Sequence, residues 1–484
     1  MSKYLKNYIN LNDAKADEAI VSPNVTKIAN SKNLHLNTHV KDEELLVIGN
    51  TLEKSRLVKK YIADTTSNPE LITLARSLGW IDSEAVKMSV LDAAAVTTVN
   101  DSSGYSLLSD SGLKSFDEFE WFTGVTLCPG YNSRGGVASL PSSCTSIKLP
   151  DSVTYIGQDI FRNCTNLASV TIPDSVASVG YGAFNGCSSL TSIDIPNSVT
   201  IIGSHAFDGC SCLNSIEIPN GVAIIGEGTF RVCTSLTSLI IPNNVTNIGD
   251  MAFGGCSSLT TIEIPNGVTI IRQSTFAGCS SSTSVTIGNS VTSIGSYAFN
   301  SCSGLTSIDI PNSVTIIGYG AFQSCSGLTS VNITDITAWC NITFGGSGSN
   351  PLSYAKHLYI NGVEVTDLVI PNSVTSIENY VFWGCSGLNS VTISNNVTRI
   401  GDMGFYLCDG LTSVTIGNSV TRIGSYAFRG CTSLTSITFT GTSAQWCAIV
   451  RDSYWHQSVP TTTVYCEGDG VTTSLDATST PTPH

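Results

Sequence analysis

Residues 174–196 read DSVASVGYGAFNGCSSLTSIDIP, and residues 197–219 repeat the pattern as NSVTIIGSHAFDGCSCLNSIEIP. The repeat of 23 residues is marked by a phenylalanine that is followed three residues later by a cysteine. The two columns are Phe161, Phe184, Phe207, Phe230, Phe253, Phe276, Phe299, Phe322, Phe382, Phe405 and Phe428, and Cys164, Cys187, Cys210, Cys233, Cys256, Cys279, Cys302, Cys325, Cys385, Cys408 and Cys431. A fixed period of this length predicts a solenoid of small stacked units instead of one globular core.

Each copy divides into a strand, a shorter extended segment and a turn. Residues 190–196 (LTSIDIP) alternate apolar and polar side chains, which is typical of a strand with one buried face. Pro196 lacks an N–H group, so the strand ends there and the chain turns a corner. Residues 199–202 predict a second, shorter strand, and Ala206 with Phe207 predicts a helical or 3₁₀ turn on the far side of the coil.

The repeat I-P-N-S-V-T-x-I-G-x-x-A-F-x-G-C-S-x-L-T-S-V-T, found from about residue 144 to 440, resembles the BspA-like leucine-rich repeats. The resemblance implies a leucine-rich repeat solenoid with a strand, a short strand and a helical or 3₁₀ turn in each coil. It also implies a surface recognition or adhesion protein that binds its partner on an extended face. It carries over no catalytic residues and no cofactor.

Composition limits the function classes. The formal net charge is −14 and only 12% of residues are charged, so a nucleic-acid backbone is not an expected partner. The six histidines are scattered and none has a metal-ligand spacing. We expect the column cysteines to be buried free thiols, with disulfides as the alternative reading. No signal peptide, transmembrane segment or membrane insertion is expected, because no apolar run is long enough.

The chain divides into five regions. The region before the solenoid resembles a degenerate EF-hand-like or dockerin-like leader, but residues 82–88 (DSEAVKM) lack the calcium-ligand series. The Asn361-Gly362 pair predicts a hairpin inside an insert that interrupts the period. The expected regions are an extended N-terminal arm (1–50), a small helical capping domain (51–126), the solenoid (127–440) with an insert at 333–371, a C-terminal cap (441–467) and a disordered tail (468–484).

The N-terminal arm offers a route to display. Residues 4–9 (YLKNYI), 22–25 (SPNV) and 34–37 (LHLN) are similar to N-terminal segments of virion proteins of phages that infect gut bacteria. The resemblance implies attachment to a virion through residues 1–50, with the solenoid projecting outward. A flexible leader is the alternative reading.

The candidate binding face is the outward column of the main strand in each coil. It contains acidic residues in its first half and hydroxyl groups in its second half, which suits a protein or glycan ligand on a cell surface; a merely solvated sheet face is the alternative. The candidate residues are Thr171, Asp194, Glu217, Glu263, Thr286, Asp309, Asn332, Thr392, Thr415 and Thr438. A second column before the Ala-Phe pair carries rings that could stack on sugars or pack against the next coil: Tyr181, His205, Tyr297, Tyr319, Tyr380 and Tyr426.

The sequence therefore predicts a non-catalytic recognition or adhesion protein on a cell surface or a phage virion. The alternative is a structural virion or scaffold protein, in which the repeats act only as a spacer or decoration.

Overall fold

The computed structural model describes residues 65–66, 88–89, 145–149, 151, 153–346 and 348–478. The chain forms two compact units, Met1–Ala223 and Ile224–His484. The expected arm at 1–50 lies outside the described residues.

The expected helical domain at 51–126 also lies outside the described residues, except for two short strands. These are β1 (Thr65–Thr66) and β2 (Met88–Ser89), which pair antiparallel.

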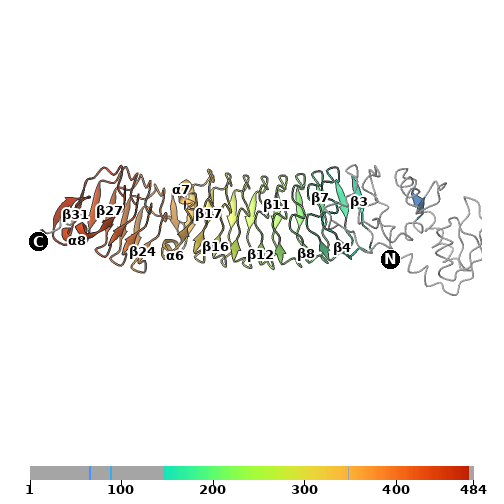
Figure 1. The fold of residues 1–484 in the computed structure, drawn as a ribbon, viewed down its shortest axis with the longest axis horizontal. Helices are drawn as coiled ribbons and strands as arrows, with labels where there is room; N and C mark the ends of the chain where they lie inside the picture. The colour runs from blue at the N-terminus through green and yellow to red at the C-terminus, as the bar shows by residue number, and fades with distance from the viewer. Residues whose placement is uncertain are drawn as a thin grey trace, which may run out of the picture. The chain divides into compact units, whose positions relative to one another are not determined.

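In the first unit, each coil contributes one strand to each of two faces, which we call the first face and the second face (Figure 1). Neighbouring coils pair in parallel, 23 residues apart, so the sequence period is the strand register. The first-face strands are β3 (Ser146–Lys148), β5 (Ser169–Thr171), β7 (Ser192–Ile193) and β9 (Ser215–Glu217). The second-face strands are β4 (Tyr155–Ile156), β6 (Ser178–Val179) and β8 (Ile201–Ile202).

The second unit repeats this architecture and confirms the predicted solenoid (Figure 1). Its first-face strands are β11 (Ser238–Ile240), β13 (Thr261–Glu263), β15 (Ser284–Thr286), β17 (Ser307–Asp309), β19 (Ser330–Ile333), β21 (Leu358–Ile360), β22 (Val363–Glu364), β23 (Asp367–Ile370), β25 (Ser390–Ile393), β27 (Ser413–Ile416), β29 (Ser436–Phe439), β31 (Thr463–Cys466) and β32 (Val471–Ser474). Its second-face strands are β10 (Ile224–Ile225), β12 (Asn247–Ile248), β14 (Ile270–Ile271), β16 (Ser293–Ile294), β18 (Ile316–Ile317), β20 (Thr343–Phe344), β24 (Ser376–Ile377), β26 (Arg399–Ile400), β28 (Arg422–Ile423) and β30 (Val450–Arg451).

The third side of each coil, the turn face, is a series of turns and not the predicted helical or 3₁₀ turn. Two positions four residues apart have left-handed backbone, as at His205 (φ 56°) and Gly209 (φ 76°), and such residues interrupt a right-handed helix. Backbone N–H groups bond alternately to the next coil and within their own turn: that of Phe184 donates to the carbonyl of Ala206 at 2.8 Å, and that of Asn185 donates to the carbonyl of Gly182 at 2.9 Å. Hydrogen bonds between coils therefore interrupt what would otherwise be a continuous helical ladder.

The core is built from the two columns that define the period. Within the second unit the rings of Phe253, Phe276 and Phe299 stack with centroids 5.4 and 5.6 Å apart. Beside them, the thiol of Cys279 donates to the carbonyl oxygen of Phe253 at 3.4 Å, and the same bond recurs from coil to coil. The eleven column cysteines are buried free thiols, as predicted.

The burial of the column cysteines predicts that their thiols react slowly with alkylating reagents. Burial raises the pKa of Cys256, Cys325 and Cys431 to about 12, and the thiolate is the form that reacts. Iodoacetamide at about pH 8 should therefore label the exposed Cys212 of the native chain well before the column cysteines, as peptide mass mapping would show. Rapid labelling of most column cysteines in the native chain would contradict the buried column.

The same pKa shifts fix the sign of a pH effect. A raised pKa favours the protonated thiol in the folded state, so its stabilisation is complete below the ordinary thiol pKa of 9.0. It is lost as the pH rises from 9.0 toward about 12.

The insert at 333–371 is an enlarged coil that contains the predicted hairpin. Its helices are α6 (Ile336–Cys340) and α7 (Leu352–Ala355). Strand β20 pairs with β18 on the second face, and β21 pairs with β19 on the first face, so stacking continues through the insert. Strands β21 and β22 pair antiparallel around Asn361-Gly362. Both turn residues have positive φ, 49° and 79°, which is the geometry that an Asn-Gly hairpin favours.

The C-terminal cap is longer than predicted. It contains helix α8 (Ser443–Ala448), whose N-cap Thr442 forms a capping box with Gln445, followed by β30 and β31. The tail expected to be disordered from residue 468 instead includes β32, which pairs antiparallel with β31. The tail is ordered there because Leu475 is buried and the indole of Trp446 donates to the carbonyl of Ser474 at 3.3 Å.

Candidate functional site

The predicted binding column lies on the first face, with its members exposed or half-buried. Three of its members, Thr171, Asp194 and Glu217, belong to the first unit, and the rest belong to the second. In the second unit the strand register aligns the residues in three separate runs. The runs are Glu263 with Thr286, Asp309 with Asn332, and Thr392 with Thr415 and Thr438.

Three column members were missed by sequence reasoning. The register places Tyr359 beside Asn332, Val369 beside Thr392 and Tyr465 beside Thr438. Val369 is 64% exposed and Tyr465 is 46% exposed. Tyr359 and Tyr465 follow the preceding column member by 27 residues instead of 23, so only their outward position in an expected strand could have identified them. Val369 keeps the 23-residue spacing to Thr392 but falls inside the expected insert, and extending the period backward from Thr392 would have found it.

The first face of the second unit contains a groove of about 870 Å³ next to the hairpin. Three predicted column residues, Thr286, Asp309 and Asn332, line it together, whereas the other predicted residues lie outside it. The lining is completed by Ile287, Asn289, Ile310, Pro311, Asn312, Ser313, Ile333, Thr334, Asn361 and Gly362. The groove therefore has buried isoleucines among amide, hydroxyl and carboxylate groups.

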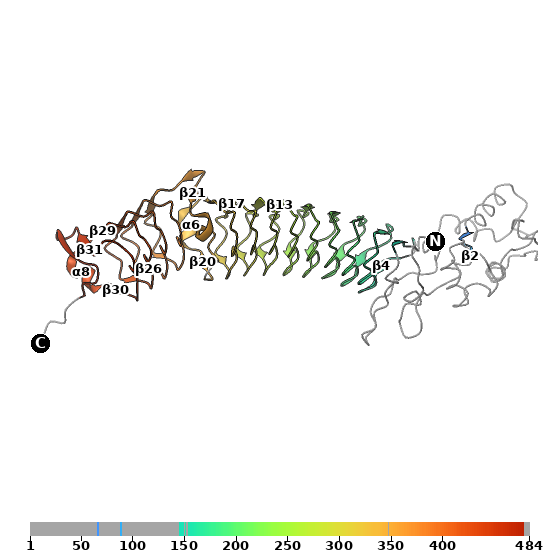
Figure 2. The same cartoon turned by 90° about the horizontal axis from the view of Figure 1, so that it is seen from above.

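The hairpin forms one wall of this groove. It stands out from the row of coils in Figure 2 and brings its turn residues Asn361 and Gly362 into the lining. The turn is attached to the first face by the N–H of Asn361, which donates to the carbonyl of Ile333 at 3.0 Å. At the base of the hairpin, His357 Nδ1 lies 2.6 Å from Glu364 Oε1. The wall is thus held at both ends.

Hydrogen bonds orient the polar groups of the groove. Asn332 Nδ2 donates to Asp309 Oδ1 at 2.6 Å, and Thr334 Oγ1 donates to Asn312 Oδ1 at 3.0 Å. Both are bonds between neighbouring coils, so stacking places the side chains. The groove offers one carboxylate and several neutral donors and acceptors, an arrangement that suits polar backbone or a basic side chain of a partner.

The predicted second column, of Tyr and His residues, occupies two different positions of the coil. His205, Tyr297, Tyr380 and Tyr426 have positive φ, whereas Tyr181 and Tyr319 directly precede the positive-φ glycines of their own coils. These two tyrosines therefore stand one position earlier in the coil. Rings of neighbouring coils touch: Tyr297 meets Tyr319 edge to face at 5.6 Å, and Tyr426 stacks on Tyr454 at 5.6 Å. These contacts favour the reading in which the rings pack between coils.

The described part of the chain holds no group of three or more His, Cys, Asp or Glu side chains placed to bind a metal ion. None of its helices has the length and apolarity needed to cross a membrane.

Comparison with known proteins gives the family. The model of the BspA type leucine-rich repeat region matches residues 140–256, 223–349 and 355–448, more than half of the chain. A leucine-rich repeat protein of Bacteroides ovatus is 31% identical, with a TM-score of 0.51, over 65% of this chain and 81% of that one. A leucine-rich cell surface protein of Faecalibacterium prausnitzii is 32% identical, with a TM-score of 0.37, over 68% of this chain and 86% of that one. No curated protein matches the sequence significantly. The chain, whose period, strand register and core columns agree with this match, belongs to the BspA type leucine-rich repeat family.

Proposed function

We propose that this protein is a non-catalytic recognition and adhesion protein that binds a partner protein on a cell surface. The contact surface is the groove beside the hairpin, on the first face of the second unit. One observation carries the proposal: three residues of the predicted binding column line a groove of about 870 Å³ that the inserted hairpin bounds. A coil that served only as a spacer would need no projecting wall at this position.

The chemistry of the groove favours a protein over a glycan as the occupant. Its amide, hydroxyl and carboxylate groups lie around the half-buried Pro311, so it combines hydrogen-bonding groups with some apolar surface, as protein interfaces do. The aromatic side chain that would serve a sugar as a stacking platform is not among its lining residues. Asp309 supplies a negative charge for a basic side chain of the partner.

The proposal is tested with the full chain, fluorescently labelled and titrated onto intact bacterial cells. Saturable binding is expected, and protease treatment of the cells should abolish it. The double variant Asp309→Ala, Asn332→Ala should weaken binding at least tenfold, about 1.4 kcal/mol. The matched control Thr415→Ala, Thr438→Ala changes the same column outside the groove and should bind normally.

Other results would overturn the proposal. Absence of saturable binding to any cell tested would favour the spacer or scaffold alternative. Binding that survives protease but is lost after periodate oxidation of the cells would assign the groove to a glycan. Display on a virion through residues 1–50 stays a prediction, which truncation of these residues tests: the repeats should fold and incorporation into particles should fail.

A further inference from the structure

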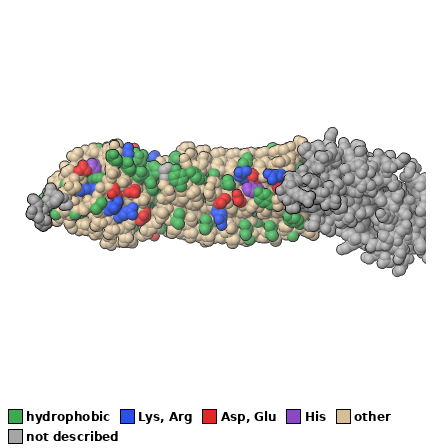
Figure 3. Space-filling model, viewed as in Figure 1, with side chains coloured by type: hydrophobic (Ala, Val, Ile, Leu, Met, Phe, Trp, Pro, Cys, Tyr) green, Lys and Arg blue, Asp and Glu red, His purple; other side chains and the backbone are tan. Residues whose placement is uncertain are grey.

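On the second face of the second unit, two arginines occupy the same position in successive coils. Arg399 of β26 and Arg422 of β28 are direct partners in the parallel register. Adjacent strands lie about 4.8 Å apart, so two like charges here require compensation. In Figure 3, charged side chains of both signs gather over the C-terminal coils, and a second group lies nearer the residues drawn in grey.

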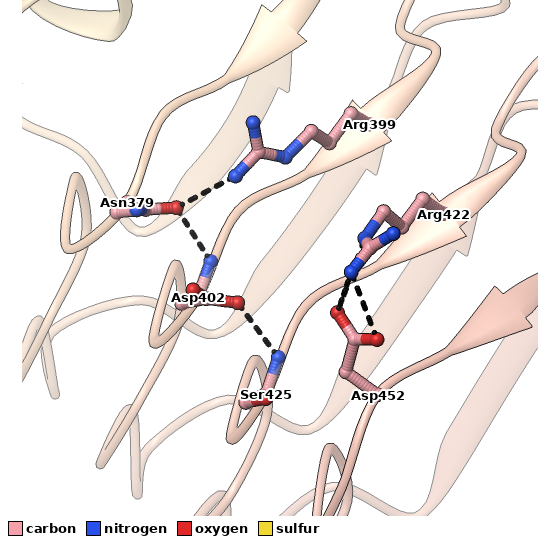
Figure 4. Close-up of polar contacts among 6 residues, drawn as sticks. All are labelled: Asn379, Arg399, Asp402, Arg422, Ser425 and Asp452. Carbon is pink, nitrogen blue, oxygen red and sulfur yellow. Dashed lines mark hydrogen bonds and ion pairs between the residues drawn. The ribbon is translucent and has the colours of Figure 1, made fainter.

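The positive charge of Arg422 is paired with a carboxylate. Its guanidinium forms a two-pronged ion pair with Asp452: Nε donates to Oδ2 at 3.1 Å, and Nη2 donates to Oδ1 at 3.0 Å and to Oδ2 at 2.8 Å (Figure 4). Asp452 directly follows Arg451, which pairs with Ile423. The carboxylate therefore comes from the next coil.

Arg399 has no such partner. One coil earlier, the position equivalent to Asp452 is occupied by Gly424. Gly424 directly follows Ile423, the pairing partner of Ile400, just as Asp452 follows the pairing partner of Ile423. No carboxylate of the described residues forms an ion pair with Arg399. Its Nη2 donates to the neutral Asn379 Oδ1 at 3.1 Å, and its Nε is buried without a hydrogen-bond partner in the described part of the chain. Arg399 therefore lacks the direct ion pair that Arg422 has, although the carboxylate of Asp402 lines the same cavity.

The surrounding groups are held in place by the stacking of coils. Asn379 Oδ1 also accepts from the N–H of Asp402 at 2.8 Å, and Asp402 Oδ1 accepts from the N–H of Ser425 at 2.9 Å. Figure 4 shows these contacts as a ladder, in which no contact is drawn from the remaining terminal nitrogen of Arg399. A cavity of about 470 Å³ is lined by Arg399, Asp402, Arg422, Ser425 and Asp452.

We propose that this cavity binds the carboxylate group of an acidic sugar, such as a uronic acid, with Arg399 as the anion-binding residue. A carboxylate supplies the direct ion pair that Arg399 lacks, and a charge-assisted bond to a guanidinium is among the stronger hydrogen bonds. The sugar hydroxyls are donors for the carboxylate of Asp402, of which one oxygen is already used by Ser425. The lining contains no apolar side chain, so it suits a hydroxyl-rich ring better than an acidic peptide. The site lies on the second face and does not depend on the groove of the first face.

The test uses the full chain and D-glucuronic acid, followed by saturation-transfer difference NMR, with D-glucose as the neutral counterpart. Glucuronic acid should bind saturably, and glucose should not. Arg399→Gln should weaken binding at least tenfold, and Arg399→Lys, which keeps the charge without the planar fork, should weaken it less. Arg272→Gln is the matched control, because Arg272 also donates to an asparagine, Asn247 Oδ1 at 3.2 Å, and does not line the cavity. Circular dichroism verifies that each variant is folded.

Three results would overturn the proposal. The first is no saturable binding of glucuronic acid, or equal binding of glucose. The second is an equal loss in the Arg272→Gln variant. The third is binding of a short polyglutamate peptide that competes with glucuronic acid and depends on Arg399, which would assign the site to acidic peptides. The variants of Asp309 and Asn332 on the first face leave this cavity intact. Loss of glucuronic acid binding is therefore distinguishable from failure of the adhesion proposal.

Discussion

Replacement of Phe276 by alanine should lower the free energy of unfolding by about 3–5 kcal/mol. The ring is fully buried between Phe253 and Phe299, and its removal opens a cavity in the middle of a continuous stack. Each coil contacts only its neighbours, so the damage should be greatest in the coils on either side. Urea unfolding followed by circular dichroism gives the loss, and amide hydrogen exchange locates it around β13 to β16.

The matched control for Phe276→Ala is Ile270→Ala on the second face. Ile270 is 46% exposed, so its truncation removes far less buried surface and should cost below about 1 kcal/mol. Similar losses of unfolding free energy for both variants would show that the phenylalanine column is not a main source of stability in this unit.

Replacement of Asn350 by alanine should cost about 2–4 kcal/mol, because it leaves several buried backbone groups without partners. The side chain is completely buried, and its Nδ2 donates to the carbonyls of Tyr380 and Val381, both at 2.7 Å. Its Oδ1 accepts from the N–H of Leu352 at 2.8 Å. One amide thus joins the insert to the coil that follows, and thermal unfolding measures its contribution.

Two further variants test whether the buried hydrogen bonds of Asn350 account for this loss of stability. Asn350→Asp has the same shape but places an oxygen against two carbonyl oxygens, so it should be at least as damaging as alanine. Asn266→Ala is the control, because the exposed Asn266 also accepts a backbone N–H, from Asn289 at 2.8 Å, and water can replace it. A loss in Asn266→Ala as large as in Asn350→Ala would contradict the role assigned to burial.

Several features of the candidate site could not be predicted from the sequence. The column was predicted residue by residue from the period, but Tyr359 and Tyr465 lie where extra residues lengthen the spacing. The groove depends on the hairpin, whose existence the Asn361-Gly362 pair predicted but whose position beside Asp309 and Asn332 it did not. Arg399 lacks an ion pair because Gly424 occupies the position that Asp452 fills one coil later.

The sequence by itself determined the period, the parallel register 23 residues apart, and the buried phenylalanine and cysteine columns. It could do so because every coil meets the same neighbours, and the same local choice is therefore repeated many times. Only the tertiary structure decided the turn face, where left-handed residues such as His205 direct hydrogen bonds to the next coil instead of into a helix. It also decided the order of β32, since Leu475 becomes buried only when the last coil is in place. Both depend on contacts between segments, which a local pattern does not encode.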